Sequence, residues 1–241
     1  DGTNYTQFSA SPDGWVLLGG GTASNQFTND LASTTNIPKL APYWDDIATG
    51  TTGAVRSVLV GAAPNRILIV EWFVTIPINT TGAANSTFQA WLYEGTNKVE
   101  FVYGTMNAGT MSASVGLSGN TPASNFQSVT VATNTSSNTT VNNTNAGQPA
   151  LGTIYSFTPL SISYNWSPAT FLSSTTIANP VATSVTATTT YTVTVTSSNG
   201  CTATATATVT ASTPASVSVS ENSGTANNGT ICEGTSATIT A

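Results

Sequence analysis

The chain has no histidine and very few charged side chains. Of its 241 residues, four are Lys or Arg and ten are Asp or Glu, so charged residues form 6% of the sequence. Ordinary globular domains contain about 25%. Nucleic-acid binding needs clustered cations, which four basic residues and a net charge of −6 do not supply. With no histidine and only two cysteines, the chain also lacks the usual ligand set of a zinc site.

Long hydrophobic runs are absent as well. None approaches the ~20 apolar residues that a membrane-spanning helix needs, so we expect no membrane span. The sequence starts at Asp1, and we expect it to begin after processing or inside a longer precursor. The scarcity of Lys and Arg leaves few cleavage sites for trypsin-like proteases, which favours an extracellular, cell-surface location.

Hydroxyl groups are abundant instead. Ser and Thr together form nearly a third of the residues, so the surface must be built from hydroxyl and amide groups in place of charges. The hydrophobic fraction of 39%, with five Trp, seven Tyr and eight Phe, is still sufficient for packed cores. This composition differs from that of disordered chains, which combine low hydrophobicity with high net charge.

Strict alternation marks an uncharged stretch, residues 188–211, with the sequence TTTYTVTVTSSNGCTATATATVTA. Thr alternates with Ala and Val from Thr202 to Thr210, and a similar alternation covers Thr190–Thr196. A period of two places one set of side chains on each face of a strand. Asn199-Gly200 between the two runs has the turn chemistry of a hairpin. The sequence therefore predicts a β-hairpin with one buried apolar face and one face coated with hydroxyls.

Strand patterns recur along the rest of the chain, and no segment shows the sustained 3.6-residue period of a capped helix. The fold class is therefore predicted to be all-β. Residues 93–98 indicate a tight hairpin connection. We predict strands at Trp15–Leu18, Ala54–Val60, Arg66–Ile76, Thr87–Tyr93, Lys98–Tyr103, Ala113–Leu117, Phe126–Ala132 and Ile154–Phe157, and a second, smaller unit that opens at Ser161–Trp166.

Composition changes along the chain predict three segments. Residues 1–157 hold most of the aromatic side chains and are expected to form a large N-terminal β-sandwich of jelly-roll type. Residues 158–212 form a smaller unit that ends with the hairpin. Residues 213–241 carry strand patterns but stop in what resembles the middle of a strand, where backbone groups would lack partners. This last segment is expected to be either the start of a further module or a strand that pairs with another element.

The second segment resembles the immunoglobulin-like repeats of large secreted surface adhesins of Bacteroidetes, which are exported by the type IX route. The resemblance implies an immunoglobulin-like β-sandwich over residues 158–212, and residues 231–241, ICEGTSATITA, resemble the opening of the next repeat. The usual Cys-x-Gly opening is absent before Trp166. The matching pieces are Trp166-Ser167-Pro168-Ala169-Thr170, Ala178-Asn179-Pro180, Thr190-Tyr191-Thr192-Val193 and Asn199-Gly200-Cys201.

The first segment resembles nidogen-type extracellular (NIDO) domains. Three pieces carry the likeness in the same order: APYWDDI at 41–47, NRILIVEWFVT at 65–75 and STFQAWLYEGTNKVEFVYG at 86–104. This resemblance implies an extracellular β module that is used in adhesive proteins and has no catalytic machinery.

Trp44, Asp45 and Asp46 are adjacent and form the most distinctive candidate binding site in the sequence. The two carboxylates could bind Ca²⁺ if they lie in a loop, while the alternative is that one Asp caps a turn and the other is exposed. Trp44 is the candidate for stacking on a sugar, because it precedes the acidic pair in an expected loop. Trp15, Trp72 and Trp91 lie within strand patterns and are expected to pack in the core.

Glu71 lies in an apolar strand pattern and, if buried, needs a cationic partner such as Arg56 or Arg66. Cys201 and Cys232 are candidates for a disulfide, which suits an extracellular protein. The alternatives are that each cysteine has a partner outside this chain or none. The immunoglobulin-like resemblance leaves the partner of Cys201 open, since either Cys232 or a more distant cysteine would serve.

A non-enzymatic role follows from the missing histidine and from the lack of a nucleophile motif such as G-x-S-x-G. Neutral, Thr-rich sheet edges lack the charges that normally keep edge strands from pairing. We therefore predict a structural or adhesive extracellular protein, a subunit of a cell-surface filament or large adhesin, that pairs strands with copies of itself or with other surface proteins. The alternative is a monomeric module that binds carbohydrate or protein at the tip of a longer adhesin.

Overall fold

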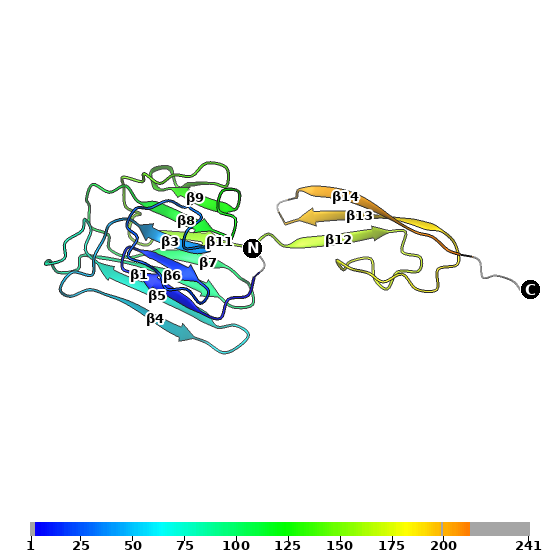
Figure 1. The fold of residues 1–241 in the computed structure, drawn as a ribbon, viewed down its shortest axis with the longest axis horizontal. Helices are drawn as coiled ribbons and strands as arrows, with labels where there is room; N and C mark the ends of the chain where they lie inside the picture. Colours follow the sequence, from blue (N-terminus) through cyan, green and yellow to red (C-terminus); the bar gives the residue numbers. More distant parts are fainter. Residues whose placement is uncertain (1–2, 199, 213–241) are drawn as a thin grey trace, which may run out of the picture. The chain divides into compact units, whose positions relative to one another are not determined.

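The computed structural model describes residues 3–198 and 200–212 (Figure 1). The chain divides into two compact units, residues 1–159 and residues 160–241. The described residues form fourteen strands in three antiparallel sheets, with one short 3-10 helix at Val131–Thr133. The predicted all-β fold class is confirmed. In this described part of the chain, no helix is long and apolar enough to cross a membrane.

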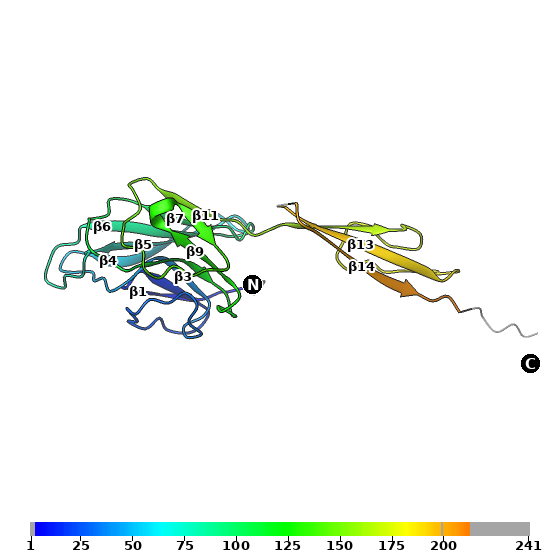
Figure 2. The same cartoon turned by 90° about the horizontal axis from the view of Figure 1, so that it is seen from above.

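Two sheets form the layers of the first unit (Figure 2), which confirms the predicted N-terminal β-sandwich. The first sheet has six strands in the spatial order β1 (Phe8–Ser11), β2 (Trp15–Leu18), β3 (Lys39–Trp44), β8 (Ser114–Ser118), β9 (Phe126–Thr130) and β10 (Thr135–Ser137). The second sheet has five strands in the order β11 (Ile154–Phe157), β7 (Val99–Tyr103), β6 (Ser86–Tyr93), β5 (Ile67–Val74) and β4 (Ala54–Val60).

The main core lies between these two sheets, because one set of alternating side chains in each strand is apolar. In β5, Val70, Trp72 and Val74 face inward and are buried. The Trp72 ring stacks on Phe88 of β6 with a centroid distance of 5.2 Å. Its indole Nε1 donates a hydrogen bond to the carbonyl oxygen of Ser11 at 2.8 Å, which ties the five-stranded sheet to the six-stranded one.

A second, smaller core lies on the outer side of the six-stranded sheet. Trp15, Leu31 and Trp44 are fully buried there, and the rings of the two tryptophans lie 5.6 Å apart. Leu31 belongs to the long connection between β2 and β3, which covers this part of the sheet. The six-stranded sheet therefore has buried side chains on both of its faces.

Three strands of the first unit, β1, β3 and β10, are not among those predicted from the sequence. β3 is buried along its whole length, so its sequence KLAPYW shows no alternation, and it contains both Lys39 and Pro42. β1 (FSAS) does alternate, but over four residues only, and β10 (TSS) contains no apolar residue. The predicted strands are present, and their ends differ from the observed ones by at most two residues.

The second unit contains one described sheet, with the strand order β12 (Ile162–Ser167), β13 (Thr189–Ser197) and β14 (Thr202–Val209). The predicted hairpin is confirmed, since β13 and β14 pair in unbroken register from Thr189 opposite Val209 to Thr196 opposite Thr202. Partners in an antiparallel pair share a face, so the threonines gather on one face and the apolar side chains on the other. Residues 213–241, the predicted third segment, lie outside the described residues.

One part of the hairpin prediction is wrong. The apolar face is buried only at Tyr191 and Val193 of β13, while Ala203, Ala205 and Ala207 of β14 are exposed. The reason is that no described residue covers the alanines. An immunoglobulin-like sandwich needs a second sheet over this face, and the described residues of this unit contain one sheet only, so that fold assignment stays a prediction.

Candidate strand-pairing interface

β14 is an edge strand with none of the usual protections against pairing. It is eight residues long, pairs with β13 on one side, and pairs with no described strand on the other. Seven of its eight residues are exposed. Edge strands normally carry charges, Pro or bulges, or are very short, because their outer N–H and C=O groups invite another strand. The sequence TATATATV has no charge and no Pro, and its pairing with β13 has no bulge.

The opposite edge of this sheet, at β12, is partly occupied by the chain itself. The backbone N–H of Trp166 donates to the carbonyl oxygen of Thr175 at 2.8 Å, and the indole Nε1 donates to that of Ile177 at 3.0 Å. These bonds fix the connection between β12 and β13 beside β12. The described part of the second unit thus offers β14 as its open edge.

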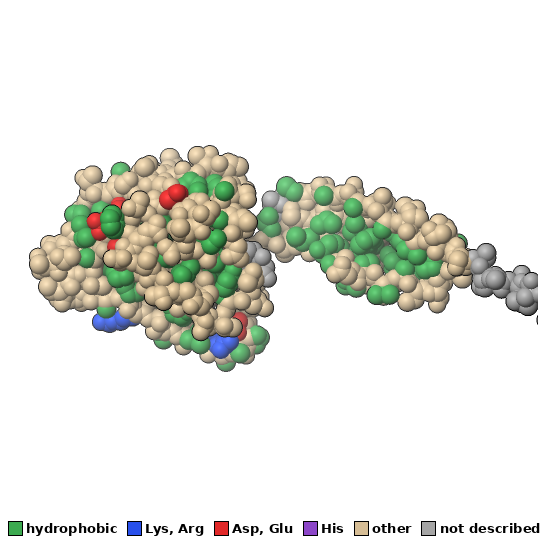
Figure 3. Space-filling view, in the orientation of Figure 1, with side chains coloured by type: hydrophobic (Ala, Val, Ile, Leu, Met, Phe, Trp, Pro, Cys, Tyr) green, Lys and Arg blue, Asp and Glu red, His purple; other side chains and the backbone are tan. Residues whose placement is uncertain are grey.

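The two faces that flank β14 are chemically opposite. The hydroxyl face is held together by contacts such as Thr190 Oγ1 to Thr208 Oγ1 at 2.9 Å, across the β13–β14 pair. On the apolar face, the phenolic O–H of Tyr191 donates to the carbonyl oxygen of Thr170 at 2.8 Å and anchors the β12–β13 connection. Hydrophobic side chains gather over the strands of this unit in the space-filling view (Figure 3).

The other sheets have less open edges. In the first unit, β1, β10 and β11 are three or four residues long. β4 is seven residues long and exposes Val58 and Leu59, but it carries the cation Arg56. Among the described strands, β14 is therefore the longest edge and has no charged side chain.

Trp44 does not have the exposed position that its predicted sugar-stacking role requires. It is the last residue of β3 rather than part of a loop, and its side chain is fully buried in the smaller core. Its indole Nε1 donates to the carbonyl oxygen of Gln26 at 2.7 Å. The prediction of a sugar-binding role for Trp44 is therefore wrong, because segment 19–38 leaves no face of the ring open to a ligand.

Asp45 and Asp46 follow β3 in a turn and are both half-buried. The Asp45 carboxylate accepts hydrogen bonds from the backbone N–H of Asp46 at 2.8 Å and of Ser112 at 2.6 Å. These contacts fit the part of the alternative in which one Asp caps a turn, whereas Asp46 is half-buried rather than exposed. Burial raises the pKa of nearby Asp13, and the charges of Asp46 and Asp45 raise it further. No group of three or more His, Cys, Asp or Glu side chains suited to a metal occurs among the described residues, and calcium binding stays a prediction.

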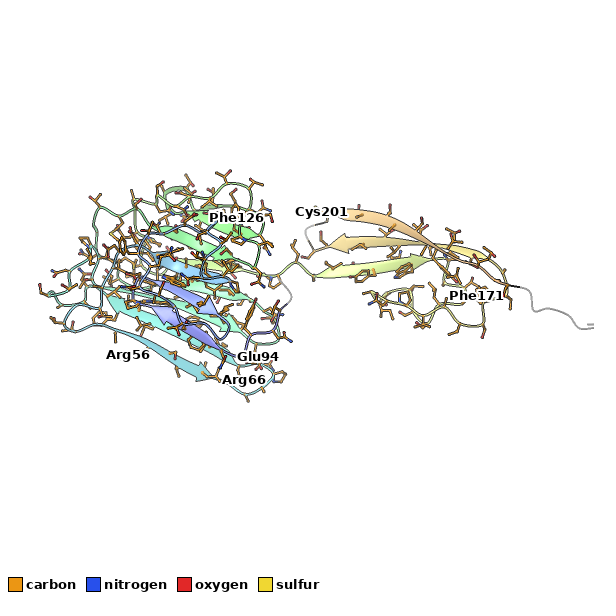
Figure 4. All side chains as sticks on the ribbon, viewed as in Figure 1. Arg56, Arg66, Glu94, Phe126, Phe171 and Cys201 are labelled. Carbon is orange, nitrogen blue, oxygen red and sulfur yellow. The ribbon has the colours of Figure 1, made fainter. Side chains whose placement is uncertain are left out.

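Glu71 is half-buried and lies directly across from Arg56 in the β4–β5 pair. Its carboxylate accepts a hydrogen bond from Gln89 Nε2 at 2.9 Å. Arg66 instead pairs with Glu94, with its NH2 group 2.6 Å from Glu94 Oε1. Figure 4 shows Arg66 and Glu94 together at one end of the sheet, with Arg56 further along β4.

Cys201 is exposed and lies just before β14. Cys232 lies outside the described residues, so the disulfide between them stays a prediction.

Trp15 and Trp72 are fully buried, as expected. Trp91 is not a core residue, because it faces away from the main core on the outer side of the five-stranded sheet and is half-buried. Alternation alone gives no sign of this difference. Alternation shows that Trp91 shares a strand face with Gln89 and Tyr93, but it does not show whether another layer covers that face.

A cleft of about 700 Å³ opens between the two sheets of the first unit, near the β9–β10 and β11 edges. Leu117 and Phe126 from one sheet and Phe157 from the other contribute to its lining. The lining contains no Asp, Glu, Lys or Arg. This cleft therefore brings no carboxylate or cationic side chain together for acid–base chemistry.

Comparison with protein families gives one match, which covers the whole first unit. The model of the family described as NIDO related matches residues 1–159. Searches of curated proteins and of solved structures give no match.

Proposed function

This chain belongs to the NIDO-related family, and we propose that it is a non-enzymatic, adhesive protein of the cell surface that assembles with copies of itself through strand pairing. The family match is consistent with an extracellular module and supports the nidogen-like resemblance of residues 41–104. The proposal adds to that match a role for the second unit, whose sequence resembles repeats of secreted surface adhesins.

The open edge of β14 is the observation that carries the proposal. Every second residue of this eight-residue strand directs its backbone N–H and C=O away from β13 toward the open edge, and nothing charged lies among them. Adding a strand satisfies these groups, and the main-chain hydrogen bonds supply affinity while alternate side chains supply specificity. The exposed Ala203, Ala205 and Ala207 would be covered in the same step.

The symmetry of the contact determines the assembly that forms. Two β14 strands paired antiparallel around a two-fold axis join two three-stranded sheets into one sheet of six strands. Such an isologous contact closes as a dimer. A filament needs a second contact, and β4 is the next longest open edge, with Val58, Leu59 and Val60 all exposed. A polymer would then alternate β14–β14 and β4–β4 contacts.

Introducing a charged side chain on the open edge of β14 tests this proposal. Thr192 of β13 and Thr206 of β14 are cross-strand partners on the hydroxyl face, but only Thr206 lies on the open edge. The variant Thr206→Lys places like charges close together in a β14–β14 contact, which opposes pairing. The variant Thr192→Lys introduces the same charge on the same face of the central strand.

The measurement is the molar mass by light scattering during size-exclusion chromatography, followed by negative-stain microscopy. We expect the wild-type chain and Thr192→Lys to form dimers or fibres. Thr206→Lys should remain monomeric where the wild type forms dimers, and should stop at dimers joined by β4 where the wild type forms fibres. A monomeric wild-type chain at high concentration, or assemblies of Thr206→Lys equal to those of the wild type, would contradict strand pairing at β14.

A further inference from the structure

The outer face of the five-stranded sheet is open, unlike the outer face of the six-stranded sheet. β4, β5 and β6 show this most clearly, because their outward side chains combine aliphatic, aromatic and polar groups in two adjacent rows. Arg56, Glu71 and Gln89 form one row, since Arg56 pairs with Glu71 and Glu71 pairs with Gln89. Val58, Ile69 and Trp91 form the next row in the same register.

These two rows line a shallow hollow of about 410 Å³. Val58 is 52% exposed, and Trp91 is half-buried, so the floor is apolar but open to solvent. The charges of Arg56 and Glu71, side by side in the first row, balance each other. The hollow therefore suits a ligand with both an apolar surface and polar groups, and with no net charge.

A chain of hydrogen bonds fixes the Trp91 ring. Its indole Nε1 donates to Gln89 Oε1 at 2.6 Å, and Gln89 Nε2 donates in turn to Glu71 Oε1 at 2.9 Å. Because both bonds are made within the protein, the indole plane is oriented before any ligand arrives. Such preorganisation reduces the entropy that is lost on binding.

Glu71, at the end of this series of hydrogen bonds, and the adjacent Arg56 can still form hydrogen bonds with a ligand. In the described part of the structure, no group donates to Glu71 Oε2, and the guanidinium of Arg56 makes no hydrogen bond or ion pair. Glu71 can therefore accept from a ligand hydroxyl, and Arg56 can donate to a hydroxyl or ring oxygen. An aromatic ring beside one acceptor and one planar donor is complementary to a sugar, which has an apolar C–H face and a rim of hydroxyls.

From this geometry we infer that the outer face of the five-stranded sheet binds a neutral saccharide, with its C–H face on Trp91 and its hydroxyls on Glu71 and Arg56. The site lies in the first unit and does not depend on strand pairing at β14. Tyr93 borders the platform, with its ring centroid 6.4 Å from that of Trp91 and its plane tilted by 41°. Lys98 Nζ lies 4.0 Å from the Tyr93 ring and closes that end.

Isothermal titration calorimetry tests the inference on the full chain. The probes are four neutral oligosaccharides, namely cellohexaose, laminarihexaose, maltohexaose and mannohexaose, with polygalacturonate and heparin as anionic comparisons. We expect at least one neutral probe to bind the wild-type chain. The variant Trp91→Ala should lower that affinity at least about tenfold, because a Trp in contact with a ligand is a typical hot spot.

Two further variants separate ligand contact from folding. Glu71→Gln keeps the size of the side chain but weakens its acceptor, and should lower the affinity without changing the melting temperature. Phe27→Ala removes another exposed aromatic ring, 55% exposed, from the connection that covers the other sheet, and should bind as the wild type does. Thermal melting of each variant shows whether the fold is retained.

The inference is overturned if none of the neutral probes binds at millimolar concentration. It is also overturned if folded Trp91→Ala retains wild-type affinity, or if only the anionic polysaccharides bind. Because the assembly variant Thr206→Lys leaves this face unchanged, it should bind the saccharide as the wild type does, whether or not strand pairing occurs.

Discussion

The ammonium group of Lys39 lies 5.2 Å from the centre of the Trp44 ring in a fully buried position. Its Nζ donates hydrogen bonds to the carbonyl oxygens of Ser33 at 3.0 Å and Asp30 at 3.3 Å. The same connection that covers Trp44 therefore also encloses this lysine. Burial lowers the pKa of Lys39 to about 8, although the nearby charge of Asp30 acts in the opposite direction.

Lys39 makes the stability of the first unit depend on pH. Because its pKa is lower in the folded state, the unfolded chain binds more protons above pH 8, so the free energy of unfolding rises with pH. The rise from this group should be about 1 to 2 kcal/mol between pH 8 and 9.5. Guanidinium unfolding at several pH values measures it. Lys39→Met should remove this rise, whereas Lys98→Met, which alters a lysine that is not buried, should retain it.

The unfolding measurements must stay below pH 10, because above that pH buried tyrosines make the free energy of unfolding fall rather than rise. Burial raises the pKa of Tyr103 well above its usual value and that of Tyr93 to about 12. Folded tyrosines of this kind hold their protons while unfolded ones lose them, so stability falls as pH rises past 10. A free energy of unfolding that does not change between pH 8 and 9.5 would contradict the role given to Lys39.

Tyr103→Phe should destabilise the first unit without changing its shape. The Tyr103 O–H donates to the carbonyl oxygen of Pro42 at 2.6 Å, so a single hydrogen bond joins β7 of one sheet to β3 of the other. Removing the hydroxyl leaves a buried carbonyl without this donor, which costs about 1 to 3 kcal/mol. Chemical denaturation measures the loss. Tyr5→Phe lies outside the core and should have a much smaller effect on the same transition.

Gly14→Ala should be strongly destabilising. Gly14 has a φ of +82° in the turn between β1 and β2, and a Cβ added there would collide with the backbone carbonyl of Tyr43. The strained dihedral and the collision together should cost at least about 2 kcal/mol. Gly147→Ala is the control, because an added Cβ meets nothing within 4 Å. Equal melting temperatures for the two variants would refute the packing described around Tyr43.

Arg66→Ala should change the titration of Glu94 more than it changes stability. Hydrogen bonds from the Arg66 side chain and backbone lower the pKa of Glu94 to about 2. Without the guanidinium, this pKa should rise toward its usual value of 4.5, as carboxyl carbon NMR would show. Both side chains are solvent-exposed, so salt screening should leave the melting temperature nearly unchanged. A Glu94 pKa that stays near 2 in the variant would contradict the pairing.

The sequence determines which side chains share a strand face, but it does not show what covers that face. Alternation locates β5, β6 and the β13–β14 hairpin, because each has a repeating apolar side. It gives the wrong environment for Trp44 and Trp91. Trp44 is covered by a connection with no periodic pattern, and Trp91 lies on a face that no such connection crosses.

For the same reason, the sequence does not predict that the Ala face of the hairpin in the second unit is exposed. The alternation of Ala and Thr in β14 predicts two different faces, and both are present. Whether the Ala face is buried depends on a second layer, and layers come from tertiary contacts that a local period does not encode. β3 shows the converse case, since a strand buried on both faces loses its alternation and escapes detection.

Residues 160–212 contain no Asp, Glu, Lys, Arg or His. A contact made by this stretch has no ion pair for dissolved salt to screen and no carboxylate for acid to neutralise. Its strength depends instead on main-chain bonding and on hydroxyls that keep one protonation state. A contact made by such a surface is therefore expected to respond little to pH or to the screening effect of salt.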